Sequence, residues 1–154
     1  MSAVNDKNIL WAKRSAVYTL SQRAISTEAL RAKIAERASR KFEAIEEAEA
    51  KALADAAVTF CTENGFLNDE LYSEYRVAEG VRKGHSRRKI AMTLKDKGIG
   101  VDDAAEAVSE VDDIESALNL ARKKGYGPWR RVAVDQKRLA KEASALRGTD
   151  FLRR

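Results

Sequence analysis

The sequence has very few of the residues that build disulfides, metal sites and sharp chain reversals. It contains one cysteine, one histidine and one proline among 154 residues. Cys61 cannot form an internal disulfide, and its apolar surroundings in the sequence favour a small core residue. His85 has no cysteine or second histidine near it, so we expect no histidine- or thiolate-based metal site.

Long apolar runs are also missing. No stretch approaches the roughly 18 consecutive apolar residues of a membrane-spanning helix. The first ten residues, MSAVNDKNIL, have neither the basic start nor the apolar centre of a secretory signal. We therefore expect a cytoplasmic protein that has no membrane partner.

Motifs of the common enzyme classes are absent from the sequence. There is no Gly-rich phosphate loop, no nucleophile elbow and no Cys–His pair at a suitable spacing. Residues 102–115 contain seven Asp or Glu and no Lys or Arg, which could suggest magnesium. These carboxylates, however, begin a capped helix and continue along a solvated face, where charge needs no ligand. We expect a protein that is not an enzyme, with no catalytic, cofactor-binding or metal-binding residues.

What the sequence has in quantity is alanine and charge. With abundant Ala, eight Gly and only 6% aromatic residues, the composition favours an all-α protein. The net charge of +5 and the isoelectric point near 9.4 permit contact with nucleic acid or with an acidic protein, but require neither.

The most informative stretch is residues 65–99. Asn68 is suited to cap a helix that ends at Gly84, and Ser86 is suited to cap a second helix that ends at Gly98. In the second helix Ile90 and Leu94 lie one turn apart on one face. The stretch therefore predicts two short helices joined by a tight turn.

Further helices are predicted on both sides of this pair. Residues 1–13 are predicted to form a polar arm. A short helix is expected over 14–23, and Ser26 is expected to cap the next helix. An Ala-rich helix is expected over about 41–64, with a bend or break allowed. Beyond the pair, Asp102 is suited to cap a short acidic helix. A basic helix then runs to Gly125, and the tail is expected to be helical to about Leu146, with Pro128 at a first helical position.

The chain also resembles itself when it is shifted by about 60 residues. This shift places Ser26, Leu30 and Ile34 on Ser86, Ile90 and Leu94, and it places Ala57, Val58 and Gly65 on Ala117, Leu118 and Gly125. The pattern indicates tandem helical modules that are each too small to bury an apolar face alone. We expect an arm over 1–13, modules over 14–50 and 51–111, and an incomplete third module over 112–154.

Basic residues accumulate on the outward side of the central pair and in the tail. Solvated helix faces often carry charge, but the triplet Arg87, Arg88 and Lys89 beside a cap favours an acidic partner. The residues that we expect to bind it are Arg76, Arg82, Lys83, Arg87, Arg88, Lys89, Lys95, Arg130 and Arg131.

The central stretch resembles the RecX family, whose modules carry a Gly–aromatic–Leu–Asp–Asp pattern followed by a basic pattern that ends in Gly–Ile. Asn68 stands in place of the first Asp and Ser73 in place of the usual Ala. The closing residues SALRGTDFLRR lack the family's usual last helix. The matching residues are Gly65, Phe66, Leu67, Asp69, Tyr72, Arg88, Lys89, Ile90, Leu94, Gly98 and Ile99.

The resemblance implies a curved, elongated array of three-helix modules that binds RecA and the RecA–DNA filament. Members of the family inhibit filament growth, ATP hydrolysis, strand exchange and repressor cleavage, and a monomer is expected. The alternative is a non-specific nucleic-acid-binding helical protein, because two short helices with an Arg-rich start imitate a helix-turn-helix. Since residues 87–97 contain no Asn or Gln to read adenine, weak DNA contact would be made through phosphates.

Overall fold

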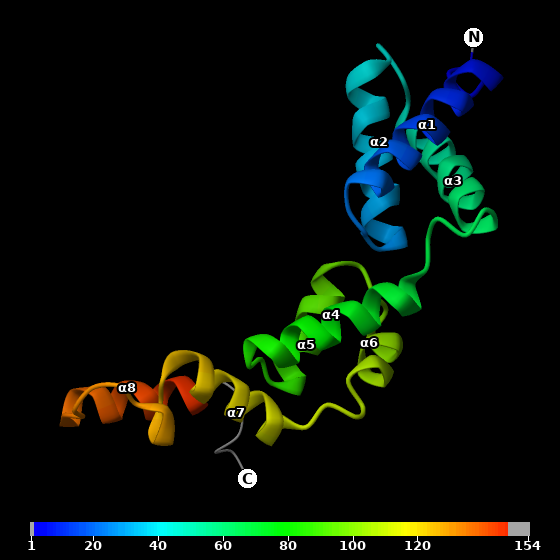
Figure 1. Cartoon of the computed structure of the whole chain (residues 1–154). Helices are drawn as coiled ribbons and strands as arrows, with labels where there is room; N and C mark the ends of the chain where they lie inside the picture. The colour runs from blue at the N-terminus through cyan, green and yellow to red at the C-terminus, as the bar shows by residue number, and fades with distance from the viewer. Residues whose placement is uncertain (1, 148–154) are drawn as a thin grey trace. The chain divides into compact units, whose positions relative to one another are not determined.

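The protein is all-α over the range that the structure describes. The structure is a computed structural model, and it describes residues 2–147. Within this range it contains eight α-helices, one short 3₁₀ turn and no strand (Figure 1). The expected fold class is therefore confirmed. Within this range the chain forms two compact units, of which the first comprises residues 2–72 and 97–99 and the second residues 73–96 and 100–147.

The first unit is built on three helices that all contact one another: α1 (Asp6–Gln22), α2 (Thr27–Lys41) and α3 (Glu47–Glu63). Leu30 and Ile34 of α2 are fully buried against Leu53 and Cys61 of α3. Cys61 is thus the small core residue that the sequence predicts, and burial raises the pKa of its thiol. Small alanines of α1, such as Ala12 and Ala16, allow the helices to approach closely.

Two expectations for the first unit are wrong. Residues 6–13 are the first turns of α1 rather than an arm, because the Asn5 side chain caps the helix by accepting from the Asn8 amide at 3.0 Å. The Ala-rich helix does not begin at Lys41. The chain leaves the α-helical conformation after Lys41, Ala44 adopts a positive φ of 56°, and Glu46 and Glu49 form a capping box that starts α3.

The second unit contains most of α4 (Asp69–Lys83), then α5 (Arg87–Asp96), α6 (Val101–Ala107), α7 (Asp113–Lys124), the 3₁₀ turn η1 (Gly127–Trp129) and α8 (Gln136–Arg147). Ile90 and Leu94 are buried, as predicted from their spacing. α6 begins at Val101, so Asp102 lies in its first turn rather than at its cap. The tail helix begins only at Gln136, because Asp135 accepts from the Arg138 amide at 2.7 Å and so caps it there.

The 60-residue repeat is visible in the hydrogen bonds of the two units. Ser26 and Ser86 both cap helices, and each hydroxyl accepts from the amide three residues later, at 3.2 and 3.1 Å. The next amide after each serine, in Thr27 and Arg87, donates to an aspartate of another helix at 2.8 and 2.7 Å. The sequence therefore predicts the repeat correctly at the level of individual caps.

Candidate functional site

The positive charge of the protein belongs to the second unit. Among the described residues, the first unit has eleven Lys and Arg against eleven Asp and Glu, whereas the second has sixteen against twelve. The described part of the second unit therefore has a net charge of +4, and that of the first unit has none. A binding surface for an acidic partner is expected there and not in the first unit.

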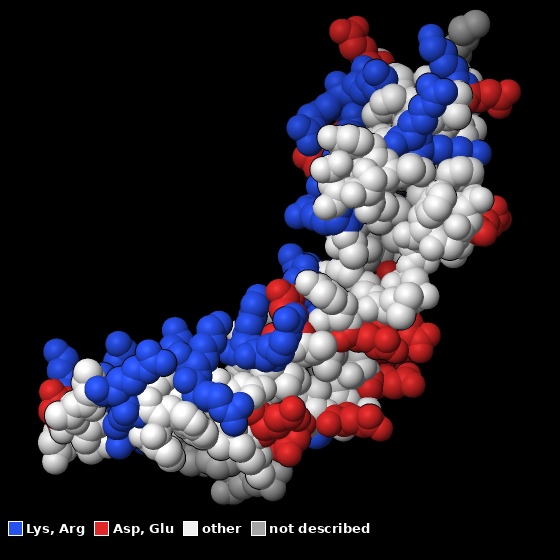
Figure 2. Space-filling model, in the orientation of Figure 1, with Lys and Arg blue, Asp and Glu red and all other residues white. Residues whose placement is uncertain are grey.

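Charges of opposite sign are also separated within the second unit. Seven of its twelve described acidic residues fall in residues 102–115, on α6, the connection after it and the start of α7. Figure 2 shows these carboxylates gathered at one edge, whereas Lys and Arg side chains cover the surface above α7 and α8. The basic surface is therefore not neutralised by the acidic run that is close to it in the sequence.

A basic cluster forms where the end of α4, the turn after it, α5 and α7 meet. We define this basic cluster as His85 and the three lysines whose charges act on its imidazole ring: Lys83, Lys89 and Lys123. The pKa of His85 is lowered, first by burial and then by the charges of Lys89, Lys83 and Lys123. The neutral imidazole is therefore favoured, and the charges of Lys83, Lys89 and Lys123, which come from separate elements, all act on one side chain.

The approach of α7 to the turn between α4 and α5 explains why the cluster forms. Asn119 of α7 donates from its side-chain amide to the carbonyl oxygen of Val81 at 3.0 Å, and this oxygen near the end of α4 also accepts from the Gly84 amide. Gly84 lies directly against Leu120, since a Cβ atom at Gly84 would be 2.4 Å from the Leu120 Cβ. This close contact brings Lys123, one turn beyond Asn119, to the turn that carries His85.

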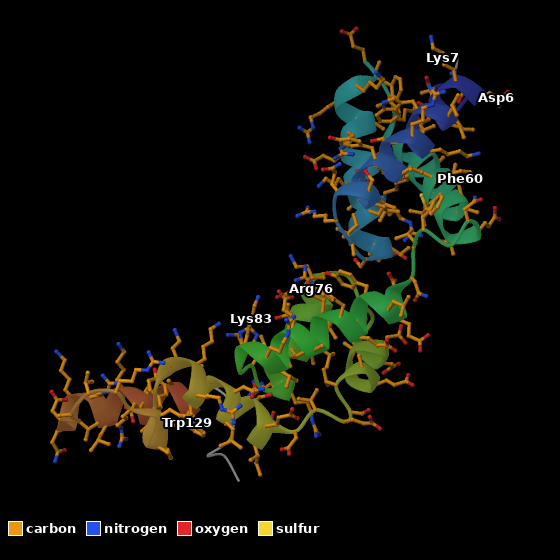
Figure 3. The ribbon with its side chains drawn as sticks, in the orientation of Figure 1. Asp6, Lys7, Phe60, Arg76, Lys83 and Trp129 are labelled. Atoms are coloured by element: carbon orange, nitrogen blue, oxygen red, sulfur yellow. The ribbon has the colours of Figure 1, made fainter. Side chains whose placement is uncertain are left out.

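Four of the nine predicted binding residues make contacts within the protein. On α4, Arg76 and Lys83 are both held by Glu79 at 2.9 Å, and Figure 3 shows them on the same side of the helix. The Arg87 guanidinium donates to the carbonyl oxygen of Val111 at 2.8 Å. Arg130 donates to Glu142, with an Nη2–Oε2 distance of 2.6 Å. Arg87 and Arg130 therefore contribute to the fold of the basic surface.

The other five predicted residues have exposed side chains: Arg82, Arg88, Lys89, Lys95 and Arg131. The prediction from sequence omitted Lys123 and its neighbours Arg122 and Lys124, which form the last turn of α7. The signal that could have identified them is the repeat, which places the end of α7 one module after the end of α3.

The Arg130–Glu142 pair should make the packing of α8 dependent on pH. Glu142 is buried, and hydrogen bonds from Arg130 lower the pKa of its carboxyl to about 2. A lowered pKa stabilises the fold fully above the ordinary value of 4.5 and ceases to do so as the pH falls towards 2. Wild type should therefore melt at a higher temperature than Glu142→Gln at pH 7, and the difference should shrink between pH 4.5 and 2. A difference that stays constant with pH would contradict this role of the pair.

Two further findings concern the part of the chain that the structure describes. No group of three or more His, Cys, Asp or Glu side chains in residues 2–147 is placed to hold a metal ion. None of the helices in this range is both long enough and apolar enough to cross a membrane.

The comparisons with known proteins agree on one family. A family model for the second three-helix domain of RecX matches residues 68–108, which contain α4, α5 and α6. A protein of Agrobacterium fabrum named regulatory protein RecX is 43% identical over 141 residues, which are 92% of this chain and 77% of the relative. Proteins of the same name from Myxococcus xanthus and Vibrio campbellii are each 37% identical, over 58% and 63% of this chain and 50% and 63% of their own lengths. No solved structure matches the chain.

Proposed function

The chain belongs to the RecX family, and from this premise we propose that it binds RecA and the RecA–DNA filament and inhibits the recombinase, ATPase and coprotease activities of RecA. The 43% identity to a regulatory protein RecX over 92% of the chain is the observation that carries the proposal. The proposed activity is regulatory and needs no catalytic residue in this chain.

We propose that the contact is made by the basic surface of the second unit. The exposed residues Arg82, Arg88, Lys89, Lys95 and Arg131 would bind acidic groups of the filament directly, together with Lys83 and Lys123 of the basic cluster. Arg76, Arg87 and Arg130 would act by holding this surface in place. The concentration of net charge in one unit supports this assignment, because steering of an acidic partner depends on local potential.

The alternative of non-specific DNA binding uses the same side chains. Phosphates and RecA carboxylates are both anionic, so salt dependence alone does not separate the two partners. Binding measured separately on bare DNA and on RecA without DNA does separate them. The proposed function requires binding to RecA in the absence of DNA. The alternative requires binding to bare DNA, with a steep loss of affinity as the salt concentration rises.

The primary experiment is the single-stranded-DNA-dependent ATPase of RecA with this protein titrated in. We expect the ATPase rate to fall in a saturable way. A rate that is unchanged when the protein is in excess over RecA would contradict the proposed inhibition.

Reversing the charge of Arg88 and Lys89 to Glu should weaken inhibition of that ATPase roughly tenfold or more, because two attractions become repulsions. Both side chains are exposed, so helicity should be unchanged. The matched control reverses Arg14 and Arg23 to Glu, two exposed charges of the first unit, and should inhibit like wild type. If the Arg88 and Lys89 variant inhibits the ATPase as strongly as the Arg14 and Arg23 variant, the basic surface does not make the contact with RecA. Arg87→Glu is tested as a variant of its own, because loss of the hydrogen bond from Arg87 to the Val111 carbonyl oxygen should also lower the melting temperature.

A further inference from the structure

An apolar groove is lined by α7, α8 and η1. Its volume is about 360 Å³. Ile114 and Leu118 of α7, Leu139 and Leu146 of α8, and Trp129 of η1 are among its lining residues, and Figure 3 labels Trp129. Ile114, Leu118 and Leu139 each expose more than two-fifths of their surface. Exposure of several large apolar side chains in one groove marks a binding surface rather than ordinary surface variation.

The repeat shows what kind of element fits such a groove. Val58 of α3 occupies the position of Leu118 one module earlier, yet Val58 is 5% exposed and Leu118 is 45% exposed. The same holds for Ala54, which is fully buried, and its counterpart Ile114, which is 41% exposed. In the first unit these positions are covered because α3 packs against both α1 and α2. The equivalent face of α7 is therefore built to contact a helix, and larger side chains than those of α3 project from it.

The charge around the groove identifies the kind of helix. Residues 113–147, from the start of α7 to the end of α8, contain nine Lys or Arg and four Asp or Glu. Two of those acids already have partners: Glu142 is paired with Arg130 and Arg138, and Asp113 accepts from the Arg87 amide. Arg122 lies 5.3 Å from the centre of the Trp129 ring, so it brings a positive charge to a residue that lines the groove. An apolar groove in basic surroundings is complementary to an amphipathic helix with an acidic outer face.

We propose that the groove between α7 and α8 docks an acidic amphipathic helix of a partner protein. Leucine-like side chains of that helix would fill the groove at spacings of three and four residues, and its carboxylates would face Arg122 and the other basic residues around the groove. This inference goes beyond the proposed function. It uses the groove rather than the basic cluster, and it holds whether or not the partner is RecA.

The test uses a synthetic peptide of about eighteen residues with leucines on one helical face and glutamates elsewhere. Trp129 lines the groove, and the only other tryptophan, Trp11, is in the first unit, so the Trp11→Phe variant makes Trp129 the sole reporter. We expect a saturable change in Trp129 fluorescence. A peptide with lysine in place of each glutamate should bind at least roughly tenfold more weakly. Equal binding of both peptides, or no binding of either, would overturn the proposal.

Substitutions in the groove supply the second arm. Leu118→Glu should weaken binding of the acidic peptide roughly tenfold or more, because it removes apolar contact and adds repulsion. Val101→Glu on α6 is the matched control, since Val101 is 68% exposed and lies outside the groove, and its affinity should equal that of wild type. Equal loss in both variants would overturn the proposal. Self-association abolished by Leu118→Glu would also overturn it, because a second copy would then occupy the groove.

Discussion

Replacing Leu94 with aspartate is expected to unfold the second unit, whereas the same change at Met92, two residues earlier on α5, is expected to leave it folded. Leu94 is fully buried and Met92 is 51% exposed. Burial of a leucine contributes about 1.5–3 kcal/mol, and an unpartnered carboxylate in its place adds a desolvation cost of several kcal/mol. Together these costs are comparable to the roughly 5–15 kcal/mol stability of an ordinary domain.

Thermal melting followed by circular dichroism measures the effect. Leu94→Asp should lose the transition of the second unit, while Met92→Asp should melt close to wild type. Ile34→Asp is the equivalent change in the first unit, since Ile34 and Leu94 share a position in the repeat and both are fully buried. A wild-type melting curve for Leu94→Asp or Ile34→Asp would show that these positions do not form the core described above.

The fold could be predicted from sequence wherever one residue type has one physical role. Ser26 and Ser86 each stand before a helical apolar pattern, and a serine in that position caps the helix whatever packs against it. The position of the break, directly after Lys41, could not be predicted. Phe42, the first residue after α2, packs in a T-shaped contact with Trp11 of α1, with a centroid distance of 5.1 Å. Local propensity contains no information about that contact, which joins residues 31 positions apart.

The candidate site was predictable in part for the same reason. Exposed basic residues on one helix, such as Arg88 and Lys89, follow from the helical period and the apolar face opposite them. Lys123 lies far away in the sequence and joins them only through the packing of α7 on the turn after α4. Arg87 and Arg130 were predicted to bind a partner, but each has a buried or backbone acceptor that no spacing rule reveals. Charge shows where a partner can bind, whereas tertiary packing decides which charges remain for it.

Gly84 couples this packing to the site, and Gly84→Ala is expected to damage both. Gly84 has a φ of +80°, a conformation that costs an alanine about 1–2 kcal/mol. A Cβ atom there would also lie 2.4 Å from the Leu120 Cβ and 2.9 Å from the Leu120 Cα. Because the second of these atoms belongs to the backbone of α7, the helix itself must move, at a further cost of about 1–3 kcal/mol.

Gly65→Ala separates the two costs. Gly65 has a similar φ of +73°, but a Cβ atom there would have no neighbour within 4 Å, so only the conformational cost applies. We expect Gly65→Ala to melt a few degrees below wild type and to inhibit the RecA ATPase normally. Gly84→Ala should melt lower still and inhibit less, because displacement of α7 carries Lys123 away from His85 and Lys89. If the two variants melt alike and inhibit alike, the close approach of α7 to this turn does not hold the basic cluster together.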